Sequence, residues 1–325
     1  MADNISTIGS DGGDDYSTPQ AWENATDNDL VAALDREFGL LRGEAHGPVG
    51  FSGGTYNASF YRWLSTIDAT HNFDHTDLTG ARIVSTNAGG CIDNNNNFLR
   101  CGGTEGTSAG AIGLKVNAAS GGTMASYHGD GTNCKLDQVV FYDSANTSDR
   151  IRAVQVSGTN DAVLNNCLIF NITAGGTDFA EGVFSTTAGN TVCNNCTLYD
   201  IDGAGASNDN GFDNCETNGC YAGGVDNPYA GTTSGDWNAA DDTSSPGANS
   251  IDDKAGGDQF VSVTVSSEDF HIKSGAALID ASQDTANEAD LDNGDGITTR
   301  NDHGCLEFVS AGGSILPQMM EQEGG

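Results

Sequence analysis

Three aspartate or asparagine side chains recur at a nearly constant spacing and could do chemistry together. Asp143, Asn171 and Asp200 follow one another at offsets of 28 and 29 (143 to 171, 171 to 200). If each belongs to one coil of a stacked structure, the two carboxylates lie about 9–10 Å apart, because neighbouring strands are about 4.8 Å apart. That distance is close to the separation of about 6.5–9.5 Å in inverting glycosidases. The alternative is a ladder of side chains that cap equivalent turns, which the middle asparagine suits equally well.

A polysaccharide lyase is the less favoured enzyme class. A lyase needs a basic group beside a cation-bound uronate, and Arg152 is the only basic residue near these acids that the spacing nominates. The same offset of 29 places Arg152 over Glu181 on the next coil (152 to 181). It therefore also predicts that these two residues lie next to each other on adjacent coils.

An acidic run near the C-terminus has the composition of a cation site. Asp290, Asp292 and Asp295 lie in a glycine-rich segment that suits calcium or another hard cation. Gly294, however, occupies the position at which an EF-hand loop requires its third ligand. A tight turn is therefore the alternative interpretation.

Two further pairs of residues have the spacing of a known zinc or redox site but lack the helix that such a site requires. His71 and His75 could bind zinc together only on a helix, and their surroundings are typical of a loop. Cys193 and Cys196 imitate a redox CxxC pair, which requires a helix start. The repeat described below places them on a strand and a turn, so we expect packed thiols.

The composition excludes several classes of protein. The 325 residues include 46 acidic and 12 basic side chains, which give a net charge of −34 that repels a phosphate backbone. We therefore expect no nucleic-acid partner. The 45 glycines argue against a helix bundle, because each glycine costs a helix interior about 1 kcal/mol. What remains is a turn-rich β architecture.

The kinds of charged residue and the N-terminus bear on location. Aspartate outnumbers glutamate and there are only four lysines, which is typical of a surface adapted to concentrated salt; an ordinary acidic protein is the alternative. Residues 1–16 lack the basic and apolar regions of a secretory signal, and no apolar run approaches the roughly 20 residues that span a bilayer. We expect synthesis in a host cytoplasm without a signal peptide, no membrane insertion, and reduced cysteines.

Internal repeats indicate the fold. Residues 153–157 match 182–186 at an offset of 29, and 163–172 match 192–201 at the same offset. Each unit contains short alternating strands separated by Gly, Asn, Thr and Asp turns, without a helical pattern. Such a period fits one coil of a parallel β-helix. We therefore expect an all-β chain that forms a single-stranded, right-handed parallel β-helix with this offset as the length of a coil.

The repeat also predicts which side chains stack along the coils. One inward apolar stack consists of Val154, Val183 and Phe212. A second consists of Val139, Cys167, Cys196 and Val225. Two asparagine ladders at turns pair Asn165 with Asn194 and Asn166 with Asn195.

The chain divides into four expected parts. They are an N-terminal cap segment over 1–45, coils over 46–225, a long polar loop over 226–258, and final strands with a C-terminal closing segment over 259–325. The ends of a solenoid expose strand edges and must be covered. Ser17 or Thr18 as N-cap, with Pro19 in the first turn, predicts a helix that caps the N-terminal end.

Both ends of the sequence resemble one family. Residues 9–22 (GSDGGDDYSTPQAW) are similar to the "DYST…AW" opening of β-helix proteins from tailed viruses, including viruses of haloarchaea. Residues 269–280 (DFHIKSGAALID) and 295–308 (DGITTRNDHGCLEF) resemble the "DFHL.SGSPAID" and "DG..R…DIGAFE" segments of a choice-of-anchor type of tail. The sequence departs from these motifs where Ala276-Ala277 replaces Ser-Pro and where His303 and Cys305 replace Ile and Ala. Secreted bacterial β-helix proteins share this tail but carry anchors, so the resemblance favours the viral branch.

The resemblance implies a virion surface component and no defined chemistry. We expect a structural homo-oligomer that decorates the capsid as a turret or spike, or that serves in the tail. Its partners would be other virion proteins and host surface glycans or surface-layer protein. No cofactor is required, and structural Ca²⁺ or another cation is the one candidate. The alternatives are a tailspike-type polysaccharide-degrading enzyme that uses Asp143 and Asp200, and a cell-surface adhesin.

Overall fold

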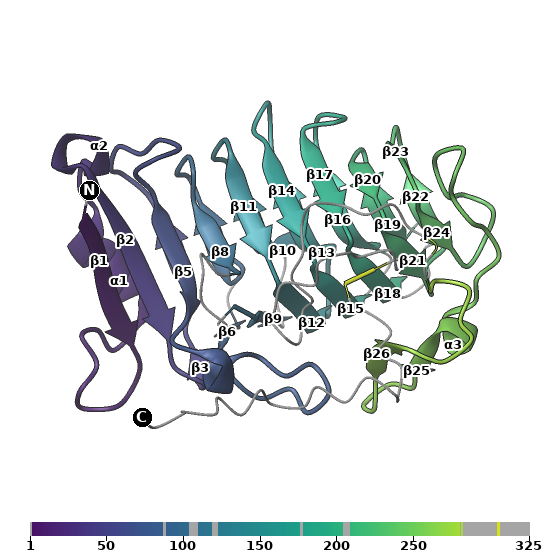
Figure 1. Ribbon diagram of the computed structural model, residues 1–325, viewed down its shortest axis with the longest axis horizontal. Helices are drawn as coiled ribbons and strands as arrows, with labels where there is room; N and C mark the ends of the chain where they lie inside the picture. Colours follow the sequence, from purple (N-terminus) through teal and green to yellow (C-terminus); the bar gives the residue numbers. More distant parts are fainter. Residues whose placement is uncertain are drawn as a thin grey trace, which may run out of the picture.

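Parallel strands dominate the structure. The computed structural model describes residues 2–86, 89–103, 110–118, 123–175, 178–203, 209–279, 281, 304 and 305. Three long parallel sheets run along the molecule (Figure 1). The chain visits these three sheets in turn, so that from β2 onward neighbouring strands within each sheet are three places apart in sequence order.

The elements have the following bounds in the described part of the chain. A nine-stranded sheet contains β1 (Ala2–Ile8), β2 (Asp35–Leu41), β5 (Arg62–Thr66), β8 (Arg100–Gly102), β11 (Cys134–Asp137), β14 (Ala162–Asn165), β17 (Thr191–Asn194), β20 (Glu216–Asn218) and β23 (Ser234–Asp236). A seven-stranded sheet contains β4 (Val49–Phe51), β7 (Ile92–Asn94), β10 (Met124–Gly129), β13 (Ile151–Val156), β16 (Ala180–Ser185), β19 (Asn210–Asp213) and β22 (Asn227–Ala230).

An eight-stranded sheet completes the set of three. It contains β3 (Ala45–His46), β6 (Arg82–Ser85), β9 (Ile112–Ala118), β12 (Val139–Asn146), β15 (Leu168–Ala174), β18 (Thr197–Gly203), β21 (Tyr221–Gly223) and β24 (Ala239–Ala240), again within the described residues. The remaining elements are the antiparallel hairpin of β25 (Phe260–Ser262) and β26 (Asp269–Ile272), the helices α1 (Pro19–Thr26), α2 (Leu30–Ala33) and α3 (Gly256–Gln259), and the 3₁₀ helix η1 (Ala69–His71).

The chain is therefore an all-β parallel solenoid, and the predicted repeat is confirmed in its middle coils. Val154 pairs with Val183, and Val183 pairs with Phe212, on neighbouring strands of the seven-stranded sheet. All three side chains are fully buried. Short alternating strands allow this stacking because every second side chain points to the same face of a sheet.

The second predicted stack is correct for three members and wrong for the fourth. Val139 is the first residue of β12, Cys167 directly precedes β15, and Cys196 directly precedes β18. The pairing of these three strands aligns the three residues on neighbouring coils. The pairing of β18 with β21 then places Cys220, and not Val225, after Cys196. The reason is a shorter turn, since two residues separate β19 from β20 whereas five separate β16 from β17.

One more coil occupies part of the segment that was expected to be a polar loop. Strands β22, β23 and β24 lie within residues 226–258 and pair with β19, β20 and β21. Phe212 is opposite Tyr229, so the offset between neighbouring coils falls to 17 here (212 to 229). The loop prediction is therefore wrong for residues 227–240, because a coil this short no longer matches the offset of 29. Similarly, β1 and β2 add strands within the expected cap segment 1–45.

An amide ladder links the C-terminal ends of neighbouring strands in the nine-stranded sheet. Asn194 Nδ2 donates to Asn165 Oδ1 at 3.0 Å, and Asn218 Nδ2 donates to Asn194 Oδ1 at 3.3 Å. On the other side, Asn165 donates to the Asp137 carboxylate. The predicted ladder of Asn165 and Asn194 is confirmed, and it extends by one coil in each direction.

The eight-stranded sheet is apolar on both faces. Its inward side chains join the interior of the solenoid, and its outward ones, including Tyr142 and Phe170, form a second core. Phe270 of the β25–β26 hairpin lies 5.2 Å from Phe170 between ring centres, and Phe73 lies 4.6 Å from Tyr142. The hairpin and the loop after η1 therefore cover the same face of this sheet (Figure 1).

Helix α1 begins where the sequence predicts. Thr18 is the N-cap, its hydroxyl oxygen accepts a hydrogen bond from Ala21 N at 3.1 Å, and Pro19 is the first helical residue. Trp22 is fully buried and meets Phe51 at 6.1 Å between ring centres. Among the described residues, no helix has the length and apolarity needed to cross a bilayer.

Candidate functional site

The Asx column, which we define as Asp143, Asn171 and Asp200, is aligned as the repeat predicts. The pairing of β12 with β15, and of β15 with β18, places its members on neighbouring strands. Their φ angles are 43°, 53° and 57°, and Gly224 on the following coil has φ 63°. Aspartate, asparagine and glycine adopt this left-handed conformation most readily. The backbone alone therefore accounts for the composition of the column.

Two members of the Asx column are held by other side chains. Lys115 Nζ lies 3.2 Å from Asp143 Oδ2. Asn171 Nδ2 donates to Asp143 Oδ1 at 3.0 Å and to Glu268 Oε1 at 2.7 Å. Glu268 is buried and belongs to the connection between β25 and β26. The hairpin that covers the sheet thus reaches into the column.

Asp200 is half-buried, as are the other two members of the column. Burial raises the pKa of its carboxyl group, and the nearby charges of Asp202 and Glu268 raise it further. A raised carboxyl pKa is a property of general acids in glycosidases. Such enzymes also need room for a sugar and a water molecule between the two acids. Here the Asn171 side chain lies between the two acids, and its amide donates to both Asp143 and Glu268.

The predicted position of Arg152 over Glu181 is confirmed, and the structure shows that the two side chains form an ion pair. The two residues are opposite each other on β13 and β16, and the guanidinium Nε donates to the carboxylate. Their side chains are only 7% and 2% exposed. The guanidinium also lies 3.9 Å from the centre of the Phe184 ring. Arg152 is therefore engaged in the seven-stranded sheet, and Lys115 is the basic group that binds the Asx column.

The cysteines have the environment of packed thiols. All nine are free and buried. Cys193 lies in β17 and Cys196 directly before β18, so neither begins a helix. Burial raises the pKa of Cys167, Cys193 and Cys220 well above its usual value. Burial also acts to raise the pKa of Cys196, but hydrogen bonds with these three thiols outweigh it and lower that pKa. The case against redox chemistry at the CxxC pair is therefore that both thiols are fully buried and that neither lies at a helix start.

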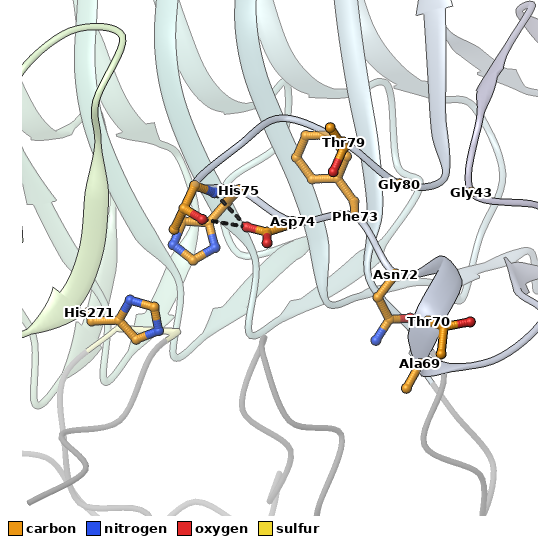
Figure 2. Close-up of a pocket in the computed structure, with 11 residues that line it drawn as sticks. Gly43, Ala69, Thr70, Asn72, Phe73, Asp74, His75, Thr79, Gly80 and His271 are labelled. Carbon is orange, nitrogen blue, oxygen red and sulfur yellow. Dashed lines mark hydrogen bonds between the residues drawn. The ribbon is translucent and has the colours of Figure 1, made fainter. Parts of the chain in front are cut away.

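The two histidines with helical spacing contact different neighbours. His71 ends η1, and its Nδ1 lies 2.8 Å from Asp68 Oδ1. His75 lies in the following loop and is 3% exposed. Its ring centre is 5.4 Å from that of His271, which comes from β26 (Figure 2).

A cavity of about 560 Å³ adjoins His75 and His271. Its walls come mostly from the loop over 69–80, with Gly43 and His271 completing them (Figure 2). Asp269 precedes His271 by two residues, and the donor atoms of His75, Asp269 and His271 all lie within 4.8 Å of one another. We call these three residues the histidine cluster. Within the described ranges it is the one group of three histidine, cysteine or acidic side chains with the spacing to hold a metal ion.

Sequence reasoning missed the histidine cluster because positions 75 and 271 are far apart in the chain. The sequence did contain a signal for two of the three residues, which is the alternation within residues 269–271. In an alternating strand, Asp269 and His271 must lie on one face while Phe270 points to the other.

The acidic segment proposed for calcium is a different case. Asp290, Asp292 and Asp295 lie outside the described residues. The calcium site therefore stays a prediction.

Comparison with known proteins does not assign the chain to a family. No family model matches the sequence, and no curated protein matches it at a significant level.

Proposed function

We propose that the three sheets form a single right-handed parallel β-helix whose N-terminal end is capped by α1. Connections between parallel strands of one sheet are right-handed in nearly all folds, which supports the handedness. The buried Trp22 of α1 against Phe51 of β4 supports the cap, because an apolar side chain there closes the end of the interior.

The function that this architecture supports best is structural: a surface protein of a tailed virus. Capsid decoration as a turret or spike is favoured over a place in the tail. The observation that carries the proposal is the Asx column. Its acids occupy positions whose left-handed backbone favours Asp, Asn or Gly. Between the acids, the side chain of Asn171 is hydrogen-bonded to that of Glu268. A column built in this way supports a rod and not a substrate cleft.

The charge of the chain suits this role. A net charge of −34 keeps a surface hydrated in concentrated salt, where its self-repulsion is screened. We expect a homo-oligomer on the virion surface that contacts other virion proteins and, through its acidic surface, host glycans or surface-layer protein. This role needs no cofactor.

Mass spectrometry of purified virions tests the structural proposal. The chain should be present in washed particles at a fixed ratio to the major capsid protein, across independent preparations. Its absence from intact particles, with recovery only in the soluble lysate, would overturn the proposal.

A second candidate is a tailspike-type hydrolase, which the raised pKa of Asp200 favours. This function predicts release of reducing ends from host polysaccharide. Asp200→Asn should abolish that release, whereas Asp209→Asn, which changes another acid with a raised pKa outside the Asx column, should not. Equal activity in both variants, or none in the wild type, would exclude the candidate.

A further inference from the structure

The histidine cluster is assembled by two segments that pack on the same sheet. Asp269 and His271 share one face of β26, because alternate residues of a strand point the same way. Phe270 points to the opposite side, into the apolar layer over the eight-stranded sheet. His75 approaches from the loop after η1, and Phe73 of that loop is buried in the same layer. The packing of two phenylalanines thus fixes where the three polar side chains meet.

We propose that His75, Asp269 and His271 bind one divalent transition-metal ion of the zinc class. Two imidazole nitrogens and one carboxylate oxygen are a ligand set that zinc and its neighbours use, whereas calcium and magnesium prefer oxygen ligands alone. The three donor atoms already lie within 4.8 Å of one another, so small side-chain rotations bring them to one ion. The adjoining cavity of about 560 Å³ leaves room for water or another ligand to complete the coordination.

The surroundings hold the ligands in place. Asp74 Oδ1 accepts hydrogen bonds from Thr76 N at 2.8 Å and Thr76 Oγ1 at 2.7 Å, which fixes the loop around His75. On β26, Asp269 Oδ1 lies 2.5 Å from His271 Nδ1. The carboxylate therefore orients His271 so that its other ring nitrogen binds the ion, as in carboxylate–histidine–metal arrangements, and its Oδ2 is the oxygen that binds the ion.

The bound ion would join the loop over 72–80 to the hairpin of β25 and β26. Both segments cover the outer face of the eight-stranded sheet, and neither pairs with its strands. An ion that binds only when both segments are docked stabilises the docked state. The inferred role of the metal is a clamp on this outer layer, and it does not depend on where the protein acts.

His128 provides a matched comparison for the cluster. Its Nδ1 lies 3.2 Å from Asp93 Oδ1 and its Nε2 lies 3.6 Å from Asp130 Oδ1. It thus lies near two carboxylates but belongs to no three-membered donor group in the described residues.

The net charge of the chain sets the salt concentration for any binding measurement. A chain of charge −34 attracts cations diffusely, so binding must be measured in concentrated salt, which screens that attraction.

Titration of the full chain with Co²⁺ in molar KCl tests the proposal. We expect one equivalent to bind, with the visible absorption of nitrogen and oxygen ligands and without the intense thiolate band that cysteine ligation gives. His271→Gln should abolish this signal, and Asp269→Asn should weaken binding about 10–100-fold. His128→Gln should bind as the wild type does. Excess Zn²⁺ should displace Co²⁺, and excess Ca²⁺ should not.

Thermal unfolding supplies a second readout. Zn²⁺ should raise the Tm of the wild type and of His128→Gln, and leave that of His271→Gln unchanged. The side chain of His271 is 40% exposed, so its replacement should leave the fold intact, which circular dichroism checks. Two results would overturn the proposal: no binding by the wild type above the Ca²⁺ background, or equal Co²⁺ binding by a folded His271→Gln variant.

Discussion

The Asx column and the histidine cluster each bring three polar side chains together, but for different physical reasons. The column takes one residue from each of three consecutive coils, and all three have the same left-handed backbone. The cluster takes its residues from a loop and a hairpin that meet only through tertiary packing. The column's residue types are explained by φ alone, whereas nothing in the local backbone requires a histidine at 75 or 271. In the column the backbone dictates which polar residues occur, whereas in the cluster tertiary packing dictates where the polar side chains meet.

The largest effect is expected for another pair that the repeat brings together, Arg152 and Glu181. Arg152→Ala leaves the buried Glu181 carboxylate without its partner, and we expect a loss of about 3–5 kcal/mol in the free energy of unfolding. The control is Asp3→Asn, which breaks the more exposed pair with Arg36 and should cost less than about 1 kcal/mol. Denaturant titration measures both. A similar loss in the two variants would contradict the stacking of Arg152 on Glu181.

A smaller effect distinguishes backbone from side chain within the Asx column. Asn171→Ala and Asn171→Gly both remove the amide, but only alanine resists φ 53°. We expect Asn171→Ala to be less stable than Asn171→Gly by roughly 1–2 kcal/mol. Equal free energies of unfolding would mean that the side chain, and not the backbone, selects asparagine here.

The smallest effect concerns the pKa of Asp200. Because the folded state raises this pKa above 3.8, ionisation of Asp200 destabilises the fold, and stability is lost as the pH rises through the folded pKa. Asp200→Asn cannot ionise, so it should be more stable than the wild type by roughly 0.5 kcal/mol at pH 7, a modest gain at a half-exposed site. The gain should vanish below about pH 4.

Asp143→Asn is the control for this pH dependence. It loses the ion pair with Lys115 and should be less stable than the wild type at pH 7. Unfolding followed between pH 3 and 8 compares the two variants. A gain for Asp200→Asn that grows as the pH falls would contradict the account.

The sequence was sufficient to predict the fold where successive coils have equal length. Val154, Val183 and Phe212 stack as expected because a constant offset reflects a constant coil. Asn166 and Asn195 were likewise expected at turns, and both are left-handed, with φ 51° and 50°. The prediction failed beyond Cys196, where the turn shortens. A repeat search depends on a constant period, and the coil that carries Tyr229 is much shorter than its neighbours.

The candidate sites were predictable to different degrees for a related reason. The alignment of the Asx column follows from the same offset as the fold, so the sequence was enough to find it. The meeting of His75 with His271 depends on how two irregular segments pack over Tyr142 and Phe170. No periodic signal encodes that packing. The side chain of Glu268 beside Asn171 was unpredictable for the same reason.

The apolar stacks and the Asx column exist only if neighbouring coils stack in register as parallel strands. The direct measurement is the pattern of inter-strand nuclear Overhauser effects in the isotopically labelled protein. We predict contacts that join the backbone of Val183 to both Val154 and Phe212, in the parallel pattern, together with coupling constants that report a positive φ at Asn171. Antiparallel contacts, or an extended φ at Asn171, would contradict the stacked coils and the structural interpretation of the Asx column.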